Sequence, residues 1–400
     1  MTVAKREICI TTDPSAYDEN IIDGYVITRG YMAGVNPTWA FATADLVGYP
    51  TLAALPMSPL FKTLRVQAHT DAVSREPIKE EATDQVAAAS IFGGTANITG
   101  SFNGAWRGWD FATTGLILGI MGYQTEAATT NVETKIAGYR YELTMIPATL
   151  AIKIVDEQAK NNNTGIRGTT SVYRGVGITS FELTLAAKQY AQFTCQWLAR
   201  QVEVYDAAYN TNSNPSGDPA LFYNAVLKWT PKNSAGAPTG SAQTFKCSNF
   251  TMTVGRTIDQ DAYMIGSQFL YDLIYNGLTN LGGQITLAPS DWDKIRAMMA
   301  GTTSDSINEI DQGKMEYFGV ASNVTANSTV LANDIPAGKF EILLHTPNGQ
   351  RVVTAITCDT AKLLSMNRDI QGRQRINKTL NWEAIINNED KFYVDVFPPS

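Results

Sequence analysis

Alternation of apolar and polar residues runs through most of the chain after residue 60 and predicts strands, because successive side chains of a strand point to opposite faces. In the clearest run, Phe181, Leu183 and Leu185 share one face, with polar residues between them. The pattern therefore predicts a mainly β fold. The expected strands are 64–69, 95–102, 141–144, 150–155, 179–185, 191–199, 250–254, 284–287, 340–345, 351–356, 380–386 and 392–396.

Two stretches break the alternation and predict helices, at 110–121 and 291–300. Asp110 and Ser290 are suitable N-caps, and Gly122 and Gly301 suit the positions where helices stop. We therefore expect one helix in each half of the chain.

Turn-forming residues indicate how the strands are connected. Pro347-Asn348-Gly349 lies between two alternating runs and predicts a hairpin. The runs on either side of Pro147 are expected to pair with each other. Residues 157–172 predict a polar loop, 206–219 and 231–243 predict insertions, and 1–60 predicts an irregular arm.

The two halves of the chain repeat one order of elements. In each, a polar stretch beginning at Arg75 or Arg256 leads to a strand with a glycine pair, Gly93-Gly94 or Gly282-Gly283, then to a helix and a strand pair. This order favours a duplicated domain. The expected parts are an N-terminal arm at 1–60, a first domain at 61–172, and a second domain at 173–400 with insertions and C-terminal strands.

The order of elements over 250–300, with Asp259-Gln260-Asp261, Ile265-Gly266-Ser267, a glycine turn, a strand and a helix, resembles the core segment of phage tail tube proteins. Residues 175–199 resemble it as well. The resemblance implies two tandem β-barrel or sandwich domains, each with one flanking helix. Most members of that family have one such domain and form hexameric rings, whereas two-domain members form trimeric, pseudo-hexameric rings. This chain resembles the second kind, with a hexameric ring as the alternative.

The same resemblance implies the partners and the location of the protein. It implies self-association into rings that stack as a tube, in a virion tail made in the host cytoplasm. It also implies contact with the tape measure, terminator and tail-tip proteins, with a sheath as a further candidate. DNA would pass through the lumen without sequence-specific binding, and no membrane is involved.

Charge agrees with a lumen that does not hold DNA. Lys and Arg total 31 and Asp and Glu total 38, which gives 31 − 38 = −7. A basic wall would bind a polyanion, whereas a neutral or acidic wall would let it slide. The segments 71–92 and 257–281 are expected to form ring contacts, with the arm as a third candidate. Candidate lumen or ring-contact acidic residues are Glu76, Glu80, Glu81, Asp84, Asp259 and Asp261; solvated surface charges or inter-ring salt bridges are the alternative interpretation.

The sequence contains no pattern typical of a catalytic site. His69 and His345 are the two histidines, and no nucleophile, phosphate-binding or zinc motif accompanies them. We therefore expect no enzyme activity, no cofactor and no metal. The four cysteines lie far apart and predict isolated thiols, with two long-range disulfides as the alternative.

Two other functions stay open from the sequence. One is another ring component of a virion, at the head–tail joint or the tail tip. The other is a β-sandwich module that binds carbohydrate or acts as an adhesin, for which the tryptophans would form a sugar platform.

Overall fold

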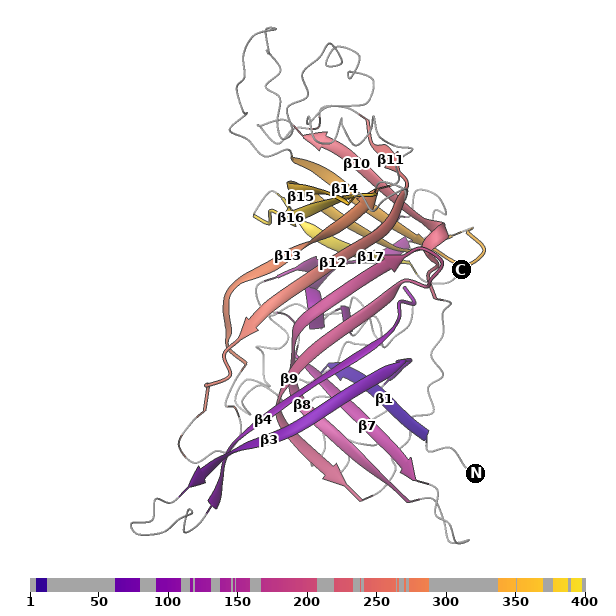
Figure 1. Ribbon diagram of the computed structural model, residues 1–400. Coiled ribbons are helices and arrows are strands. Elements are labelled where there is room, and N and C mark those ends of the chain that lie inside the picture. Colours follow the sequence, from indigo (N-terminus) through magenta and orange to yellow (C-terminus); the bar gives the residue numbers. More distant parts are fainter. Residues whose placement is uncertain are drawn as a thin grey trace.

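The computed structural model of the protein is mainly β, as the alternation predicts (Figure 1). Its described strands, seventeen in number, are joined by hydrogen bonds into one sheet. The structure describes residues 5–12, 62–79, 91–108, 116–117, 119–130, 137–144, 147, 149–158, 167–206, 219–232, 238, 241–263, 265, 270, 273–287, 337–349, 351–369, 377–387 and 390–397.

The first half of the chain forms an antiparallel run of strands in the lower part of Figure 1. Its strands are β1 (Lys5–Thr12), β2 (Lys62–Leu64), β3 (Ala68–Lys79), β4 (Ile91–Ala105), β5 (Gly122–Thr130), β6 (Ala137–Leu143), β7 (Leu150–Gln158), β8 (Arg167–Ala186) and β9 (Gln192–Tyr205). Seven of them lie in the order β3-β4-β9-β8-β7-β1-β2.

The second half repeats this run. It begins with the short helix η4 (Phe222–Asn224), and its strands are β10 (Ala225–Lys232), β11 (Gln243–Phe245), β12 (Cys247–Ile258), β13 (Tyr275–Leu287), β14 (Ala337–His345), β15 (Val352–Asp369), β16 (Asn377–Ala384) and β17 (Phe392–Val396). Seven of them lie in the order β12-β13-β16-β15-β14-β10-β11. Each of the six strand pairs in the first run therefore has a counterpart at the same place in the second.

Irregularities of register are repeated as well. The shift between Ile178 and Ser180 in β8 recurs between Leu363 and Ser365 in β15. The shift between Leu150 and Ile152 in β7 recurs between Gly338 and Phe340 in β14. We call two residues equivalent when they hold the same place in these corresponding strand pairs.

Equivalence corrects one detail of the sequence analysis. Gly100 pairs with Trp197, and Gly283 pairs with Trp382, so these two glycines are equivalent. The pair Gly93-Gly94, which suggested the repeat, lies earlier in β4 and does not match Gly282-Gly283. A Cβ on Gly100 would lie 2.1 Å from the Trp197 ring, so that glycine is required by the packing of the tryptophan.

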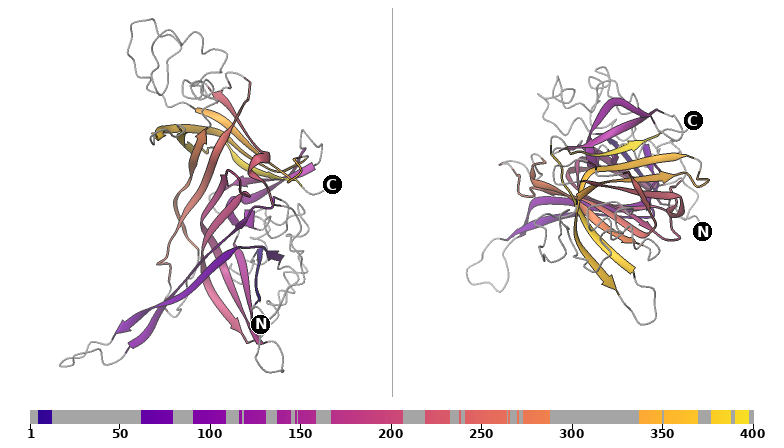
Figure 2. Two further views of the ribbon diagram at one scale, coloured as in Figure 1. Left: turned by 45° about the vertical axis from the view of Figure 1, so that its right-hand side comes forward. Right: turned by 90° about the horizontal axis from the view of Figure 1, so that it is seen from above.

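The two runs join into one curved sheet through β8 (Figure 2). The N-terminal half of β8 pairs with β7, and its C-terminal half, from Ser180 to Ala186, pairs with β12. The expected domain boundary between residues 172 and 173 lies inside β8. The repeat in strand pairing instead separates the chain between β9 and β10.

Strands β5 and β6 lie outside the two repeated runs, whereas β17 pairs with β15 beyond the end of β16 and corresponds to the end of β9. Strand β6 pairs with β5 and β17, whereas β7 pairs with β1 and β8, so the expected pairing of 141–144 with 150–155 is wrong. Arg140 of β6 donates hydrogen bonds of 2.8 and 2.9 Å to the Asp395 carboxylate of β17. This contact joins residues far apart in the chain, so local spacing did not reveal it.

Aromatic side chains fill the core on one side of the sheet. Trp106 packs edge-on against Phe181 and Phe193 in the first run, and Trp382 packs against Phe250 and Phe340 in the second. These rings are all buried. The alternation that predicted the strands therefore also identified the buried face.

Several segments differ from the expectation in extent. Residues 5–12 form β1 rather than an irregular arm, and the strand expected at 64–69 is divided, because β2 ends at Leu64 and β3 begins at Ala68. The hairpin at Gly349, whose φ is +71°, is confirmed. Helix is present at 116–117 and 119–121; the rest of the first expected helix and all of 291–300 lie outside the described residues.

Candidate functional site: a polar sheet face between two strand edges

The outward side of the sheet carries mostly uncharged polar side chains. In β9, Phe193, Cys195 and Trp197 are buried, and Thr194 and Gln196 between them are exposed. Neighbouring strands continue this outward side, which we call the polar face. Its residues include Thr70, Ser101, Asn103, Ser180, Glu182, Thr184, Thr194, Gln196, Thr251, Thr253, Gln284, Thr286, Lys362, Ser365, Thr379, Asn381 and Glu383.

Register places these residues in rows that cross both halves of the chain. One row runs from β9 through β8 and β12 to β15, and its members are Gln192, Thr184, Thr251, Gln284, Asn381 and Ser365. Every side chain in this row is a hydroxyl or an amide. The polar face is therefore continuous across the β8–β12 junction.

Hydrogen bonds between neighbouring strands hold these side chains in place. The hydroxyls of Thr70 and Ser101 lie 2.8 Å apart, and those of Thr286 and Thr379 lie 3.0 Å apart. These cross-strand bonds satisfy part of the hydrogen-bonding capacity of the face.

Charge is sparse on the polar face. Among the residues named for this face, Glu182 and Glu383 are acidic, and Lys362 lies in register with Glu383. Thr184 donates a hydrogen bond of 3.0 Å to the Glu182 carboxylate. The alternating run that exposes Glu182 and buries Phe181 is visible in the sequence, whereas the acidic residues expected at a lumen or ring contact lie in other segments.

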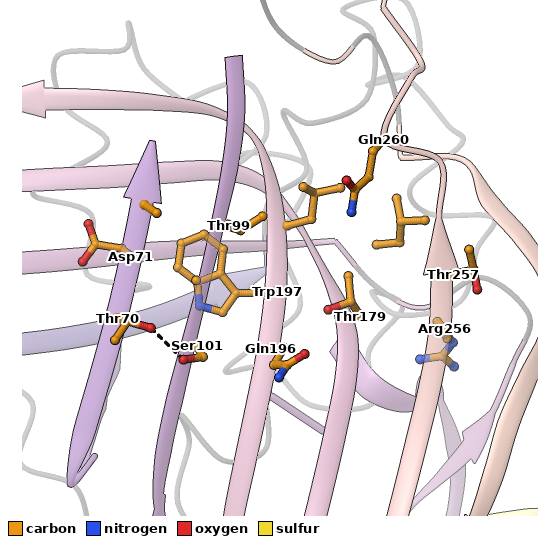
Figure 3. A pocket seen from close by; sticks show the side chains of 14 residues that line it. Thr70, Asp71, Thr99, Ser101, Thr179, Gln196, Trp197, Arg256, Thr257 and Gln260 are labelled. Atoms are coloured by element: carbon orange, nitrogen blue, oxygen red, sulfur yellow. Dashed lines mark hydrogen bonds between the residues drawn. The ribbon is translucent and has the colours of Figure 1, made fainter. Parts of the chain in front are cut away.

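A hollow of about 520 Å³ lies over β3, β4, β9, β8 and β12 (Figure 3). In Figure 3, Thr70 and Ser101, joined by a hydrogen bond, lie on neighbouring strands beside Gln196 and Thr179. Trp197 also lines this hollow. Its lining offers hydroxyls, amides and one aromatic ring, together with the side chains of Asp71 and Arg256.

The carboxylate of Asp71 also lines the hollow, at the β3 side. It accepts a hydrogen bond of 2.5 Å from the Tyr173 hydroxyl, and its other oxygen lies 3.6 Å from His69 Nε2. Burial first, and the hydrogen bond to Asp71 second, raise the pKa of Tyr173. The phenol therefore stays protonated and keeps the carboxylate in one orientation.

Two strand edges bound the polar face among the described residues. Strand β3 pairs with β4 on one side and with no described strand on the other. The second edge is formed by residues 363–369 of β15. One side of this segment pairs with β16, whereas on its other side the pairing with β14 stops at Ala337, opposite Lys362. Val73 on β3 is 49% exposed and Leu364 on β15 is 46% exposed. Exposed apolar side chains on a sheet edge favour association.

The structure describes three of the acidic residues expected from sequence, Glu76, Asp259 and Asp261, and places them at the ends of hairpins. Glu76 is exposed near the end of the β3–β4 hairpin, beyond the point where β4 stops pairing with β9. The Asp261 amide donates a hydrogen bond of 2.9 Å to the Asp259 carboxylate, just after β12. Burial raises the pKa of Tyr263, and Asp261 and Glu76 add to the shift, so these two carboxylates come near one phenol. Glu80, Glu81 and Asp84 lie outside the described residues.

Other groups with reactive chemistry are held inside the fold. Cys195, Cys247 and Cys358 are free thiols, which excludes the two-disulfide alternative, and burial raises the pKa of Cys247 to about 11. Among the described residues, no group of three or more His, Cys, Asp or Glu side chains is placed to hold a metal ion. Within the same ranges, no helix has the length and apolar character needed to cross a membrane.

A sheet with a polar face, and with two edges that no described strand covers, is typical of a structural protein that associates through its strands. Comparison with known families agrees with this class. The family model described as phage tail tube protein matches residues 24–384, most of the chain. The chain belongs to the phage tail tube protein family. It is therefore a structural, virion tail component that assembles into a tube with other tail proteins. No curated protein sequence matches the chain.

Proposed function

We propose that the protein forms trimeric rings, that the rings stack as the tail tube, and that viral DNA passes along their lumen into the host. The observation that carries this proposal is the continuous sheet made by two equivalent runs of strands. Each chain then supplies two equivalent blocks, so three chains make a ring with six-fold pseudo-symmetry. A head-to-tail contact that closes generates such a ring.

Strand number supports three chains rather than two. Each chain would line the lumen with eight strands, namely β3, β4, β9, β8, β12, β13, β16 and the end of β15. With strands about 4.8 Å apart and tilted by about 40°, three chains give a barrel about 50 Å across between backbones. Two chains give about 30 Å, and side chains from both walls narrow this by about 10 Å. Three chains leave clearance around a duplex.

The polar face suits a wall that conducts DNA. A polyanion binds where lysines and arginines neutralise its phosphates. Apart from Lys362 beside Glu383, the named residues of the polar face carry no positive charge. The face would therefore pass DNA without retaining it. The β3–β4 hairpin, which projects from the body in Figures 1 and 2, supports a role in contact between stacked rings.

Electron microscopy and mass measurement test the ring. Concentrated protein should show rings and stacked tubes in negative stain, and native mass spectrometry of the rings should give three chains of 43.6 kDa each. A protein that stays monomeric at high concentration, or a ring of six chains, would contradict the proposal.

The lumen is tested by adding positive charge to it. Thr194→Lys with Thr379→Lys changes two equivalent positions of the polar face, giving six added lysines in a ring of three chains. Particles with this tube should release DNA more slowly, and added salt should restore the rate. The matched control is Thr194→Gln with Thr379→Gln. Equal release rates from both variants would show that this face does not meet DNA.

A further inference from the structure

We propose that neighbouring chains join through β3 of one chain and residues 363–369 of β15 of the next, in the register that β12 makes with β8. The occupant of each open edge is thus a second copy of this chain. This inference rests on the ring proposed above and names its strand edges and register. The β8–β12 junction inside the chain is the template for the junction between chains.

Equivalence of the strands leads to this assignment. Strand β12 is equivalent to β3, and β8 is equivalent to β15, because their partners correspond throughout the two runs. Within the chain, β12 covers the C-terminal half of β8 beyond the end of β7. On β15 the corresponding segment lies beyond the end of β14, and no described strand covers it. The strand equivalent to β12 is β3, so β3 of another copy would pair with this segment of β15.

One pair of valines shows what the edge lacks. Val73 pairs with Ile98, and its equivalent Val254 pairs with Leu281. Val254 also pairs with Phe181 of β8 and is 3% exposed, whereas Val73 is 49% exposed. The same residue type on the same strand position is thus buried in one run and open in the other. A neighbouring strand on β3 would bury Val73 as β8 buries Val254.

Transferring the internal register predicts the pairs between chains. Thr251 lies opposite Thr184, and Gly255 lies opposite Ser180, in the internal junction. In the transferred register, Val73 lies opposite an apolar residue and Asp71 lies opposite a base. The predicted pairs are Ser74 with Ser365, Val73 with Met366, Ala72 with Asn367 and Asp71 with Arg368.

The pair of Asp71 with Arg368 distinguishes the two junctions. Their equivalents in the internal junction are Met252 and Leu183, which are paired and buried. The Asp71 carboxylate accepts a hydrogen bond of 2.5 Å from the Tyr173 hydroxyl. The Asp71 side chain is 32% exposed at the open edge. A carboxylate oriented in advance is ready for a cation on the incoming strand. Opposite charges directly across a junction select one register and one partner edge.

Disulfide trapping tests the register. A disulfide needs Cβ atoms about 3.5–4.5 Å apart, which direct cross-strand neighbours approach and diagonal neighbours at about 7–8 Å do not. Oxidised tubes of Ser74→Cys with Ser365→Cys should therefore yield covalent dimers and trimers on denaturing gels. The matched control, Ala72→Cys with Ser365→Cys, is displaced by two residues and should stay monomeric, as should each single variant.

The outcomes separate this inference from the proposed function. Tubes that form with wild-type dimensions but give no cross-link in the first variant would overturn the edge assignment and leave the ring intact. Cross-links in the displaced control instead would overturn the register. Absence of any ring in the unmodified protein would overturn the proposed function and this inference with it.

Charge exchange tests the Asp71–Arg368 contact. Asp71→Arg or Arg368→Asp alone places like charges opposite each other and should raise the critical concentration for assembly by about tenfold or more. The double exchange should recover most of that loss. If Asp71 acted only within its own chain, through Tyr173, Arg368→Asp would not rescue Asp71→Arg, and that result would refute the contact.

Discussion

Strands β3 and β12 hold the same place in the two repeated runs, yet they differ in their surroundings. Strand β12 lies between β13 and β8, whereas β3 has β4 on one side alone among the described residues. Val254 and Arg256 of β12 are buried, while their equivalents Val73 and Arg75 are exposed. A strand's burial is thus set by its neighbour as much as by its own pattern. One edge is satisfied within the chain, and the other is left for assembly.

The largest effect should come from the equivalent tryptophans, which test whether the two runs contribute equally. Trp197→Ala and Trp382→Ala should each lower the free energy of unfolding by about 3–5 kcal/mol, because each removes a buried ring. Urea denaturation followed by circular dichroism measures both. Thr194→Ala and Thr379→Ala, on the outward face, are the controls. A large loss in one variant and none in its equivalent would break the comparison.

The valines separate folding from assembly. Val254→Asp buries an unpaired carboxylate and should lower the free energy of unfolding by about 3 kcal/mol. Val73→Asp should change the stability of the monomer by less than about 0.5 kcal/mol, because that side chain is half exposed. Sedimentation velocity should nevertheless show that Val73→Asp no longer forms rings. Equal stability losses in the two variants would contradict the difference between the edges.

The arginines should give a smaller difference. The Arg256 guanidinium donates hydrogen bonds to the carbonyls of Ile120 and Thr144, and burial lowers its pKa to about 10. Arg256→Met leaves those carbonyls without their charged donor and should cost about 2 kcal/mol in urea denaturation. The exposed equivalent, Arg75→Met, should cost less than about 0.5 kcal/mol. A larger loss for Arg75→Met would reverse the comparison.

The smallest effect on stability is expected where the two runs differ. Strand β9 is continuous, whereas its counterpart is divided into β16 and β17. Between them, Asp390 accepts hydrogen bonds from Lys232 at 2.9 Å and Thr360 at 2.5 Å. Burial acts to raise the pKa of Asp390, but Thr360, Lys232 and Asn387 together lower it. The ionised carboxylate therefore stabilises the fold above its ordinary pKa, and this stabilisation is lost as pH falls through the lowered value.

Asp390→Asn should accordingly reduce the free energy of unfolding by about 1 kcal/mol at pH 7. The difference from the unmodified protein should narrow below about pH 4, the ordinary range of the carboxyl pKa. Thermal unfolding across this pH range provides the measurement. A difference that stays constant with pH would show that the charge of Asp390 is not involved.

Local patterns predicted much of the fold. Alternation located the strands around Phe181, Phe250 and Leu380, and Pro347-Asn348-Gly349 located a hairpin, because both signals depend on residues close in sequence. The pairing of 141–144 with 150–155 was wrong for the opposite reason. The partner of β6 is β17, and the Arg140–Asp395 contact between them has no local signal.

The assignment of the candidate acidic residues to a lumen or a ring contact stays a prediction. The structure exposes Glu182 and Glu383 on the polar face, two acidic residues that the sequence analysis did not single out. Glu76, Asp259 and Asp261 instead lie at hairpin ends. Net charge is a sum over the whole chain, so it carries no information about which side of the sheet each charged residue occupies or which strands are neighbours.

The sequence by itself determined the β-rich class and the buried and exposed sides of strands such as β8 and β9. Those features follow from side-chain alternation and turn chemistry, which act over a few residues. Only the tertiary structure decided that β12 joins β8, that Val254 is buried while Val73 is exposed, and that β3 and the end of β15 remain open. Backbone hydrogen bonds pair strands far apart in the chain, and every residue offers the same donor and acceptor, so the sequence carries little record of which edges meet.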